Sequence, residues 1–419
     1  MSSLLRRLAP DAVLASRRAP VDPETLAAAA EIVEDVREGG EEALRRHAER
    51  LGDLVPGTPL LYDTDALGSA LGELPVDHRD LLTRVAERIQ AFAAAQRSSL
   101  TNITVAVEGG EAGHHWVPVT SAGAYAPGGR YPLPSSVLMT VIPARVAGVT
   151  TVWVASPRPS VITLAAAAVA GADGLLAVGG AQAIAALAFG VLSPTCDLIV
   201  GPGNRWVTAA KKHLYGEVGI DGLAGPSEIL VIADDSADPR LVAADLLAQA
   251  EHDPEAVPML ITTDAGLADD VDDELRRQLE DLPTAEIARP ALGNGFSVVV
   301  ADLDTASVLA ERLAPEHLAI HVAEADALAN ALTSYGSLFV GDSTAETFAD
   351  YGVGPNHVLP TGGGARFQSG LSVATFLRSP TWLRLDQPQN LVEDTANLAR
   401  LEGLEAHARA ATARSGWVE

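Results

Sequence analysis

The chain has 419 residues, of which 47% are hydrophobic, so it is long enough for two or three packed domains. Its formal net charge of −26 argues against nucleic acid or an anionic membrane surface as a partner, and no apolar run is long enough to span a bilayer. The single cysteine, Cys196, excludes an intrachain disulfide and a thiolate metal site, so nitrogen and oxygen must hold any metal.

The first part of the chain is predicted to be mostly helical. Residues 1–11, MSSLLRRLAPD, do not show a secretory signal, so with one cysteine we expect a cytoplasmic protein. Apolar positions with helical spacing predict helices over 22–50 and 76–99, the first divided at Gly39-Gly40. Residues 103–119 alternate like a β-hairpin that turns at Gly109-Gly110.

From residue 122 onward, predicted strands alternate with predicted helices. Strands are expected over 122–125, 151–155, 174–178 and 198–200, and helices over 135–147, 161–170 and 184–189. This rhythm predicts a parallel sheet covered on both faces. Glycine-rich loops follow three strands, at 127–129, 179–182 and 201–204. One such loop is ordinary turn chemistry, whereas three at one sheet edge favour a nucleotide crevice.

A second block of the same kind follows residue 227. Its strands are predicted over 229–233, 258–262, 296–300, 318–322 and 337–340, and residues 391–414 are predicted to form one terminal helix. The fold class is therefore α/β, with two Rossmann-like parallel-sheet domains and small helical terminal segments.

A candidate metal site lies at the end of the first helix in this second block. Asp238-Pro239 has the form of a helix start, and Pro254 blocks the helix from continuing. Gln249 and His252 are three apart, so they share one face of the last turn and can hold half of a metal's coordination shell. A solvated helix end would give the same pattern.

Two further segments supply candidates for catalysis. In APEHL, residues 314–318, Glu316 and His317 lie where a strand begins. Histidine suits a general base near neutral pH, and glutamate can activate water if burial raises its pKa. In ETFADYGVGPNHVLPT, residues 346–361, Asp350 offers an anionic metal ligand and His357 shares its loop. A surface Glu-His pair is the alternative for APEHL.

Several other polar residues are given structural roles. His321 lies within a predicted strand and is expected to be a satisfied core histidine, and Lys211-Lys212-His213 is expected to be a solvated helix face. Cys196 has no basic neighbour in SPTCDLIV to lower its pKa, so a nucleophilic role is rejected. Glu402 and His407 are five apart on the predicted terminal helix, which indicates an exposed polar helix when it is considered alone.

The motifs together resemble the histidinol dehydrogenase family from about residue 119 to 407. GAYAPGG, GGAQAIAAL, GPGN, AGPSEIL with AQAEH, APEHL and the Asp350 loop occur in the order of that family. The resemblance implies a homodimer that binds Zn²⁺ and NAD and converts L-histidinol through L-histidinaldehyde to L-histidine with two NAD⁺, as in histidine biosynthesis. Ala349 departs from the glycine expected before the ligand aspartate.

The resemblance also implies a role for each candidate residue. Glu316 would activate water, and His317 would remove protons. NAD contacts are implied for Tyr125, Gln182 and Asn204. The implied zinc ligands are Gln249, His252, Asp350 and, from the partner subunit, His407. The implied substrate contacts are Ser227, Gln249, His252, His317, Asp350, His357, Glu402 and His407.

We expect four parts of the chain on this basis. They are an N-terminal helical segment that also belongs partly to the catalytic domain (1–100), an NAD-binding-type domain (101–226), a metal and catalytic domain (227–378), and a tail exchanged within a dimer (379–419).

Three other functions remain open at this point. A sibling enzyme that oxidises a small sulfonated diol would share GAYAPGGRYPL and LYGEVGID, although Glu402 and SGLSVATFLR favour the histidinol enzymes. A zinc hydrolase would use Glu316 as base to a water on the metal, but it would not need the first α/β block. A non-catalytic NAD-binding protein would not need both proton-transfer candidates.

Overall fold

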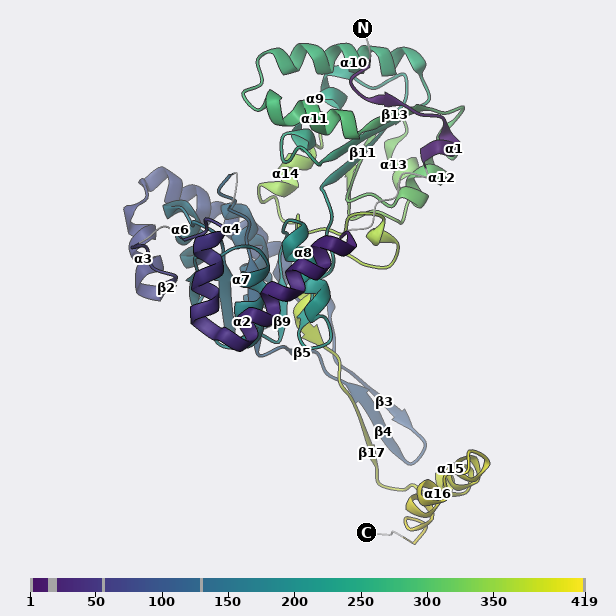
Figure 1. The fold of residues 1–419 in the computed structure, drawn as a ribbon. Coiled ribbons are helices and arrows are strands. Elements are labelled where there is room, and N and C mark those ends of the chain that lie inside the picture. Colours follow the sequence, from purple (N-terminus) through teal and green to yellow (C-terminus); the bar gives the residue numbers. More distant parts are fainter. Residues whose placement is uncertain (1–2, 14–20, 55–56, 129–130, 417–419) are drawn as a thin grey trace.

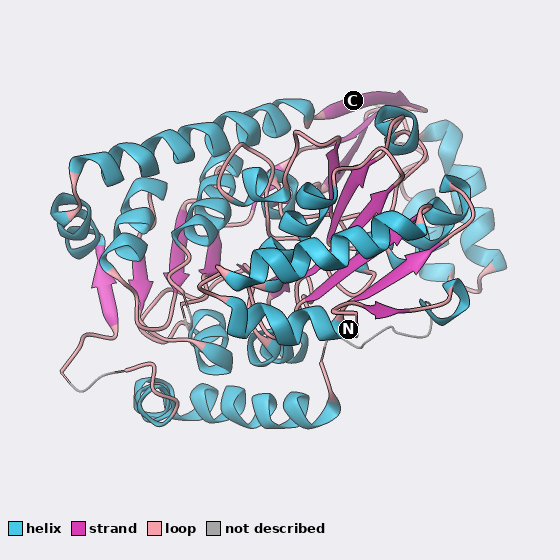
Figure 2. Cartoon of the chain, turned by 90° about the horizontal axis from the view of Figure 1, so that it is seen from above, coloured by secondary structure: helices cyan, strands magenta, loops and turns pink. Residues whose placement is uncertain are grey.

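A computed structural model describes residues 3–13, 21–54, 57–128 and 131–416. Two six-stranded sheets, each with helices packed on both of its faces, form two adjacent bodies (Figures 1 and 2). A narrow arm extends from them and ends in a helical hairpin. This architecture confirms the predicted α/β class. None of the helices in the described ranges is long and apolar enough to cross a membrane.

The first sheet is parallel apart from one edge strand, and it carries the predicted glycine-rich loops. Its strand order is β10 (Gly219–Ile220), β9 (Leu198–Val200), β6 (Ser121–Tyr125), β7 (Thr151–Ala155), β8 (Gly174–Leu176) and antiparallel β2 (Leu61–Asp63). One face packs on α3 (Thr64–Glu73), α4 (Val76–Ser99), α5 (Pro134–Ala147) and α6 (Val161–Ala170). The other packs on α2 (Pro23–Arg50), α7 (Gly180–Phe189) and α8 (Arg205–Leu214).

The second sheet is entirely parallel. Its order is β1 (Arg6–Arg7), β13 (Phe296–Val299), β12 (Val257–Thr262), β11 (Glu228–Ala233), β14 (His317–His321) and β15 (Ser337–Val340). One face packs on α9 (Pro239–Ala250), α10 (Ala265–Glu280) and α11 (Ala285–Asn294). The other packs on α1 (Pro10–Val13), α12 (Leu303–Leu313) and α13 (Ala325–Ala329). The N-terminal strand thus joins the second sheet, whereas α2 to α4 cover the first.

The arm is built from segments far apart in the sequence. It contains an antiparallel sheet of β3 (Ile103–Val107), β4 (Gly110–His114) and β17 (Thr381–Leu385), and the pair β5 (Val117–Pro118) and β16 (Leu377–Arg378) fixes its base. The tail hairpin, α15 (Gln389–Leu401) and α16 (Glu405–Thr412), lies at the far end of the arm (Figure 1). Short helices α14 (Glu346–Asp350), η2 (Gly364–Arg366) and η3 (Val373–Phe376) lie in the connections.

The structure corrects several predicted boundaries. The terminal helix is two helices, because Gly403 adopts a left-handed φ of 77° that no helix can continue through. Helix α7 begins at Gly180 rather than at residue 184, and the hairpin turns at residues 108–109 rather than at Gly109-Gly110. The predicted break at Gly40 is confirmed by its φ of 53°. Gly129 of the first glycine-rich loop lies outside the described residues.

Candidate active site

The catalytic candidates gather at the amino edge of the second sheet. Glu228 begins β11 and His317 begins the neighbouring strand β14, with Glu316 directly before it. Helix α9 runs antiparallel to these strands, so its last turn brings Gln249 to the same edge. A sheet edge and a helix end thus place side chains from three segments within reach of one another.

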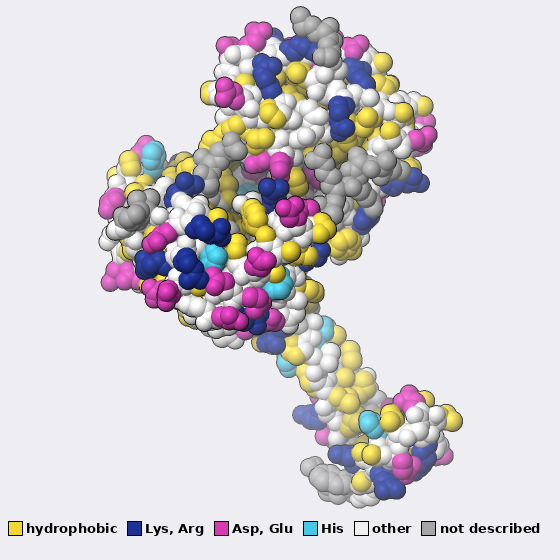
Figure 3. Space-filling model, in the orientation of Figure 1, with side chains coloured by type: hydrophobic (Ala, Val, Ile, Leu, Met, Phe, Trp, Pro, Cys, Tyr) yellow, Lys and Arg dark blue, Asp and Glu magenta, His cyan; other side chains and the backbone are white. Residues whose placement is uncertain are grey.

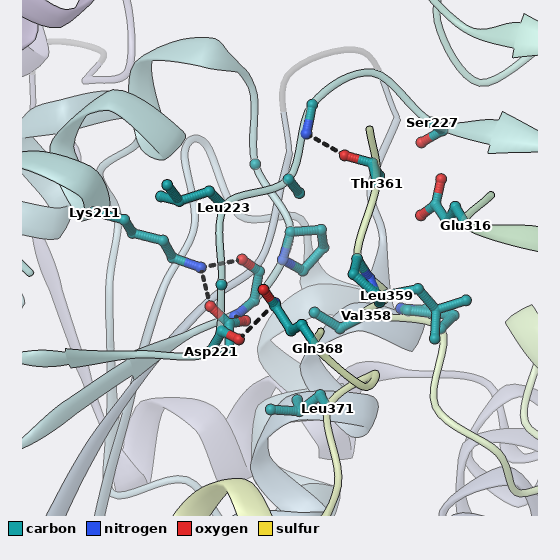
Figure 4. Close-up of a pocket in the computed structure, with 18 of the residues that line it drawn as sticks. Lys211, Asp221, Leu223, Ser227, Glu316, Val358, Leu359, Thr361, Gln368 and Leu371 are labelled. Carbon is teal, nitrogen blue, oxygen red and sulfur yellow. Dashed lines mark hydrogen bonds and ion pairs between the residues drawn. The ribbon is translucent and has the colours of Figure 1, made fainter. Parts of the chain in front are cut away.

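A small cavity of about 80 Å³, partly open to solvent, lies between this edge and the glycine-rich loop at residues 201–203 of the first sheet. Its walls include Gly201 and Gly203 on one side and Ser227 and Glu316 on the other. In Figure 4 the hydroxyl of Ser227 and the carboxyl of Glu316 lie beside each other at this second side. One glycine-rich loop of the first sheet and the expected catalytic residue Glu316 therefore line the same cavity.

A buried ion pair fastens one wall of the cavity. Lys211 donates to the Gly201 carbonyl at 2.6 Å and to Asp221 Oδ1 at 2.7 Å, and Gly201 N–H donates to Asp221 Oδ2 at 2.7 Å (Figure 4). Gln368 donates to the Asp221 carbonyl at 3.0 Å. Lys211 is only 3% exposed, so the expectation of a solvated face at residues 211–213 was wrong for this residue.

His317 is oriented as a general base. Its Nδ1 lies 3.0 Å from the Glu228 carbonyl and 2.9 Å from Gln249 Oε1. A carbonyl only accepts, so Nδ1 carries the proton and Nε2 carries the lone pair. Nε2 is buried, has no hydrogen-bond partner among the described residues, and lies 3.9 Å from Asp350 Oδ1. Burial lowers the pKa of His317, which keeps the imidazole neutral and able to accept a proton.

Glu316 is buried next to a second carboxyl. Its Oε2 accepts the Glu228 N–H at 2.8 Å, and Glu228 Oε1 accepts the Gly362 N–H at 3.1 Å. Burial, and then the charges of Glu228 and Asp350, raise the pKa of Glu316 well above its ordinary value. Burial raises the pKa of Glu228 to about 7. Glu316 thus meets the condition for taking a proton from water near neutral pH.

Glu346 was not singled out from the sequence. It lies one turn before Asp350 on α14, is 1% exposed, and places Oε2 3.7 Å from His317 Nδ1. Burial first, and then the charges of Asp350, Asp245 and Glu316, raise the pKa of Glu346 well above its ordinary value. Buried carboxyls that crowd in this way favour a cation arriving among them, either a metal ion or the amine of a substrate.

The donor set fits a borderline divalent ion. His252 Nε2 and Asp350 Oδ2 are 3.8 Å apart, close to the separation of about 3.3 Å expected for two ligands of one tetrahedral zinc ion. Gln249 Oε1 faces His317 and has a second lone pair to offer. No group of three or more His, Cys, Asp or Glu side chains forms a metal cluster within the described part of the chain. The reason is that one expected ligand is a glutamine and another, His407, lies in the tail.

His357 lines the cavity, but both of its ring nitrogens have partners. Nδ1 lies 3.0 Å from the Asp350 carbonyl, and Nε2 lies 3.2 Å from the Ser136 hydroxyl on α5. Burial lowers the pKa of His357. The side chain thus joins the Asp350 loop to the first body. Ala349, where the resemblance predicts glycine, is buried and leaves Asp350 beside His317.

The three expected NAD contacts lie at the carboxyl edge of the first sheet. Tyr125 ends β6, and its hydroxyl accepts the Gly180 N–H at 3.3 Å. Gln182 lies in the first turn of α7 and donates to Asp53 Oδ2 at 2.7 Å. Asn204 caps α8 by accepting from Trp206 N–H at 3.0 Å. The parallel strands bring these loops to one edge, as predicted for a nucleotide crevice.

Glu402 and His407 do not reach the site of their own chain. Both are exposed in the tail hairpin, which Figure 1 shows at the opposite end of the molecule from α14. Glu402 directly follows α15, and His407 lies in α16. One chain therefore brings together the expected catalytic and metal residues of the second sheet, but not Glu402 and His407 of the tail.

Sequence patterns missed the residues whose partners are distant in the chain. Glu228, Glu346 and Asp53 were not assigned, although the spacing of Glu346 and Asp350 on one helix face offered a signal. Nothing local marks Asp53. Cys196 is buried, and burial raises the pKa of its thiol to about 12, which agrees with the rejected nucleophilic role.

Comparison with known proteins adds a family likeness to this geometry. The sequence model of the histidinol dehydrogenase family matches residues 15–415. Histidinol dehydrogenase from Thermus thermophilus is 49% identical over 90% of this chain and 92% of its own length. The corresponding protein of Haloarcula marismortui is 46% identical over 92% of each chain.

Solved structures show the same likeness. The crystal structure of histidinol dehydrogenase from Elizabethkingia anophelis superposes with a TM-score of 0.91 at 30% identity, covering 99% of this chain and 98% of the other. An acetylating aldehyde dehydrogenase from Geobacillus thermoglucosidasius matches with a TM-score of 0.51 at 17% identity over 90% of this chain and 96% of its own, which shows a shared fold alone.

Proposed function

The chain belongs to the histidinol dehydrogenase family, and on that premise we propose that it oxidises L-histidinol through L-histidinaldehyde to L-histidine, reducing two NAD⁺. The observation that carries this proposal is the lone pair of His317 Nε2. It is buried, lies 3.9 Å from Asp350 Oδ1, and has no hydrogen-bond partner among the described residues, so it is free to accept a proton from a substrate. The comparisons give no support to a sulfonated-diol oxidase or a zinc hydrolase.

We assign the two cofactors to different sheet edges, one in each body. We assign NAD⁺ to Tyr125, Gln182 and Asn204, in the region 101–226. We assign Zn²⁺ to Gln249, His252, Asp350 and the partner subunit's His407, with the first three in the region 227–378. When bound, zinc supplies a Lewis acid that binds and orients the amino alcohol, and NAD⁺ supplies the hydride acceptor.

In the first oxidation, His317 Nε2 takes the hydroxyl proton of L-histidinol as a hydride leaves the carbon that bears this hydroxyl for the acceptor, and an aldehyde results. His317 releases this proton to solvent before the second oxidation. Glu316 then takes a proton from water while the hydroxide oxygen bonds to the aldehyde carbon. His317 removes the remaining hydroxyl proton during the second hydride transfer, which yields the carboxylate. Ser227, His357 and the partner subunit's Glu402 are assigned to holding the substrate.

The chain acts as a homodimer with shared sites in this proposal. Exposed apolar side chains surround the Asp350 loop (Phe348 56%, Tyr351 62%, Val353 59%), and others lie on the tail near His407 (Leu398 60%, Leu401 86%, Leu404 43%). Figure 3 shows hydrophobic side chains along the arm as well. These two exposed apolar surfaces support a dimer in which the tail of each chain covers the Asp350 loop of the other. Such a dimer would bring His407 to the partner's His252 and Asp350.

A substrate panel tests the proposed function. NADH formation is measured with L-histidinol, other amino alcohols and small sulfonated diols, using zinc-loaded protein. We expect turnover with L-histidinol to exceed all others. Preferred oxidation of a sulfonated diol would instead establish the sibling activity.

A further inference from the structure

Asp53 reaches the cofactor edge of the first sheet from a distant part of the chain. It lies in the turn after α2, where its backbone N–H donates to the Ala48 carbonyl at 2.8 Å. Its carboxylate Oδ2 accepts the Gly179 N–H at 3.0 Å and the Gln182 amide at 2.7 Å. The end of α2 thereby holds the loop that opens α7.

Asp53 decides how the amide of Gln182 is turned. A carboxylate accepts hydrogen bonds, so Gln182 must direct its NH₂ toward Asp53 and its Oε1 the other way. Gln182 is only 1% exposed, and Oε1 is buried with no partner among the residues that the structure describes. Buried polar atoms almost always have partners, so an acceptor held open here indicates a donor from a ligand.

Two backbone amides at the amino end of α7 already bind the protein's own oxygen atoms. Gly179 N–H donates to Asp53, and Gly180 N–H donates to the hydroxyl of Tyr125. In Rossmann-like proteins such amides commonly bind the diphosphate of a dinucleotide. A diphosphate at this place would meet the Asp53 carboxylate. The contact that the loop offers is therefore the neutral acceptor Gln182 Oε1, which suits a hydroxyl donor.

We propose that Asp53 is a positioning residue for NAD⁺: it orients Gln182 so that Oε1 accepts a hydrogen bond from a ribose hydroxyl of the cofactor. This inference rests on the proposed function, because it takes NAD⁺ as the ligand of the first sheet. Asp53 itself acts only through Gln182.

The test varies NAD⁺ at saturating L-histidinol in the zinc-loaded dimer. Asp53→Ala should raise the KM for NAD⁺ about tenfold, the value of one good hydrogen bond, and leave kcat and the KM for L-histidinol within about twofold. Asp53→Asn keeps an acceptor oxygen for Gly179 and Gln182, so it should restore most of the affinity. Asp53→Ser replaces the alanine variant if that variant does not fold.

A double-mutant cycle separates positioning from general damage. Gln182→Ala should raise the KM for NAD⁺ at least as much as Asp53→Ala, and the double variant should be no worse than Gln182→Ala alone. Asp63→Ala is the matched control, because Asp63 caps the nearby helix α3 through Ala66 N–H and should leave the KM for NAD⁺ unchanged. Multiplying effects in the double variant, or an unchanged KM for NAD⁺ in Asp53→Ala, would overturn the inference.

NAD⁺ binding measured by calorimetry keeps the two hypotheses distinguishable. If wild-type protein forms no NADH from L-histidinol, the proposed function fails, and the same variants are compared by their Kd for NAD⁺. Equal Kd values for wild type and Asp53→Ala would then refute the role of Asp53 by itself.

Discussion

Two neighbouring residues, Glu316 and His317, face different chemical tasks because their surroundings differ. His317 has its Nδ1 proton fixed by the Glu228 carbonyl, whereas Glu316 has an elevated pKa from burial and nearby charges. A neutral imidazole can take the alcohol proton in each oxidation. A carboxylate of raised pKa is suited to activating water for the intermediate step.

This division of labour predicts different kinetic effects of the two substitutions. His317→Asn should slow the oxidation of both L-histidinol and L-histidinaldehyde by roughly 10²–10⁴, the usual contribution of a general base. Glu316→Gln should impair the aldehyde step far more than the alcohol step. The two oxidations are measured separately by supplying each compound with NAD⁺. Equal losses in both steps from Glu316→Gln would contradict the assignment.

A second prediction at the residue scale concerns the metal. His252→Asn removes one nitrogen donor, so zinc retention after dialysis should fall at least about tenfold, since even residues outside the coordination shell contribute roughly 10–100-fold. Zinc content is measured by atomic absorption, and a chelator should abolish turnover of the wild-type protein. His213→Asn is the control, because His213 pairs with Glu34 on the surface. Full zinc content in His252→Asn would exclude this residue as a ligand.

Residue types and spacing predicted the polar residues at the edge of the site but not the buried contacts behind them. APEHL marks Glu316 and His317 because a strand begins there. By contrast, the contacts of Lys211 with Asp221 and of Gln182 with Asp53 join segments whose proximity depends on tertiary packing. From sequence alone, a lysine on a helix such as Lys211 is expected to be solvated, because its buried partner Asp221 is not apparent. The spacing of Gln249 and His252 allowed a metal site, but the assignment of Gln249 as a zinc ligand rested on the family resemblance.

At the scale of elements, α9 is tied to β14 by two polar contacts in register. Gln249 contacts His317 at 2.9 Å, and Asp245, one turn earlier on the helix, contacts His321 Nε2 at 3.0 Å. His321 Nδ1 also contacts Asp342 Oδ1 at 2.9 Å. The sequence predicted a satisfied core histidine at this place, and the structure confirms it. The pairing holds the helix that carries Gln249 and His252 against the strand that carries His317.

This pairing predicts a pH-dependent stability. Burial acts to lower the pKa of His321, but hydrogen bonds and charge from Asp245 and Asp342 outweigh it and raise the pKa above the ordinary value of about 6.5. Because the pKa of His321 is higher in the folded state than in the unfolded state, its protonation stabilises the folded protein. This stabilisation is fully present below pH of about 6.5 and is lost as the pH rises through the folded-state pKa. The wild-type thermal midpoint should therefore fall over this interval, and His321→Gln should flatten the profile.

The same substitution should also destabilise the protein at pH 6. Removing one partner of a buried ion pair costs roughly 3–5 kcal/mol, and His321 is 2% exposed. His213→Gln removes an exposed pair with Glu34 and should cost about 0–1 kcal/mol at most. Thermal unfolding of both variants between pH 6 and 9 checks this prediction, and parallel pH profiles for wild type and His321→Gln would refute it.

Hydrophobic periodicity predicted elements best where a whole segment is buried. Helices α5 to α7 and strands β6 to β9 have apolar cores on both faces of the first sheet, and most of their limits were predicted closely. Strand β2 and helix α3 were missed, because β2 is a short edge strand that pairs only with β8. The single predicted terminal helix was wrong because Gly403 was not recognised as a helix end.

At the scale of the whole molecule, the arm separates the tail from the body of its own chain. Its apolar side chains Ile103, Val105 and Leu383 are 45%, 50% and 64% exposed. A long exposed arm with an apolar surface has little to stabilise it as a monomer. This exposure supports the proposal that a second copy covers the arm and receives His407 in its own site.

Mixed dimers test that exchange. His407→Asn and His252→Asn should each be inactive, because each lacks one ligand in both sites. If one chain's His252 meets the partner subunit's His407, a mixed dimer contains one intact site and one doubly altered site. Dissociation and remixing should then restore part of the activity. Verified mixed dimers that stay inactive would show that each tail serves its own chain.

The most direct test of the central claim is the stoichiometry of complete turnover. Limiting L-histidinol is incubated with excess NAD⁺ and zinc-loaded protein, and NADH, L-histidinaldehyde and L-histidine are all quantified. One site that performs both oxidations predicts two NADH and one L-histidine for each L-histidinol consumed, without accumulation of the aldehyde. One NADH per L-histidinol with release of L-histidinaldehyde, or no NADH at all, would contradict it.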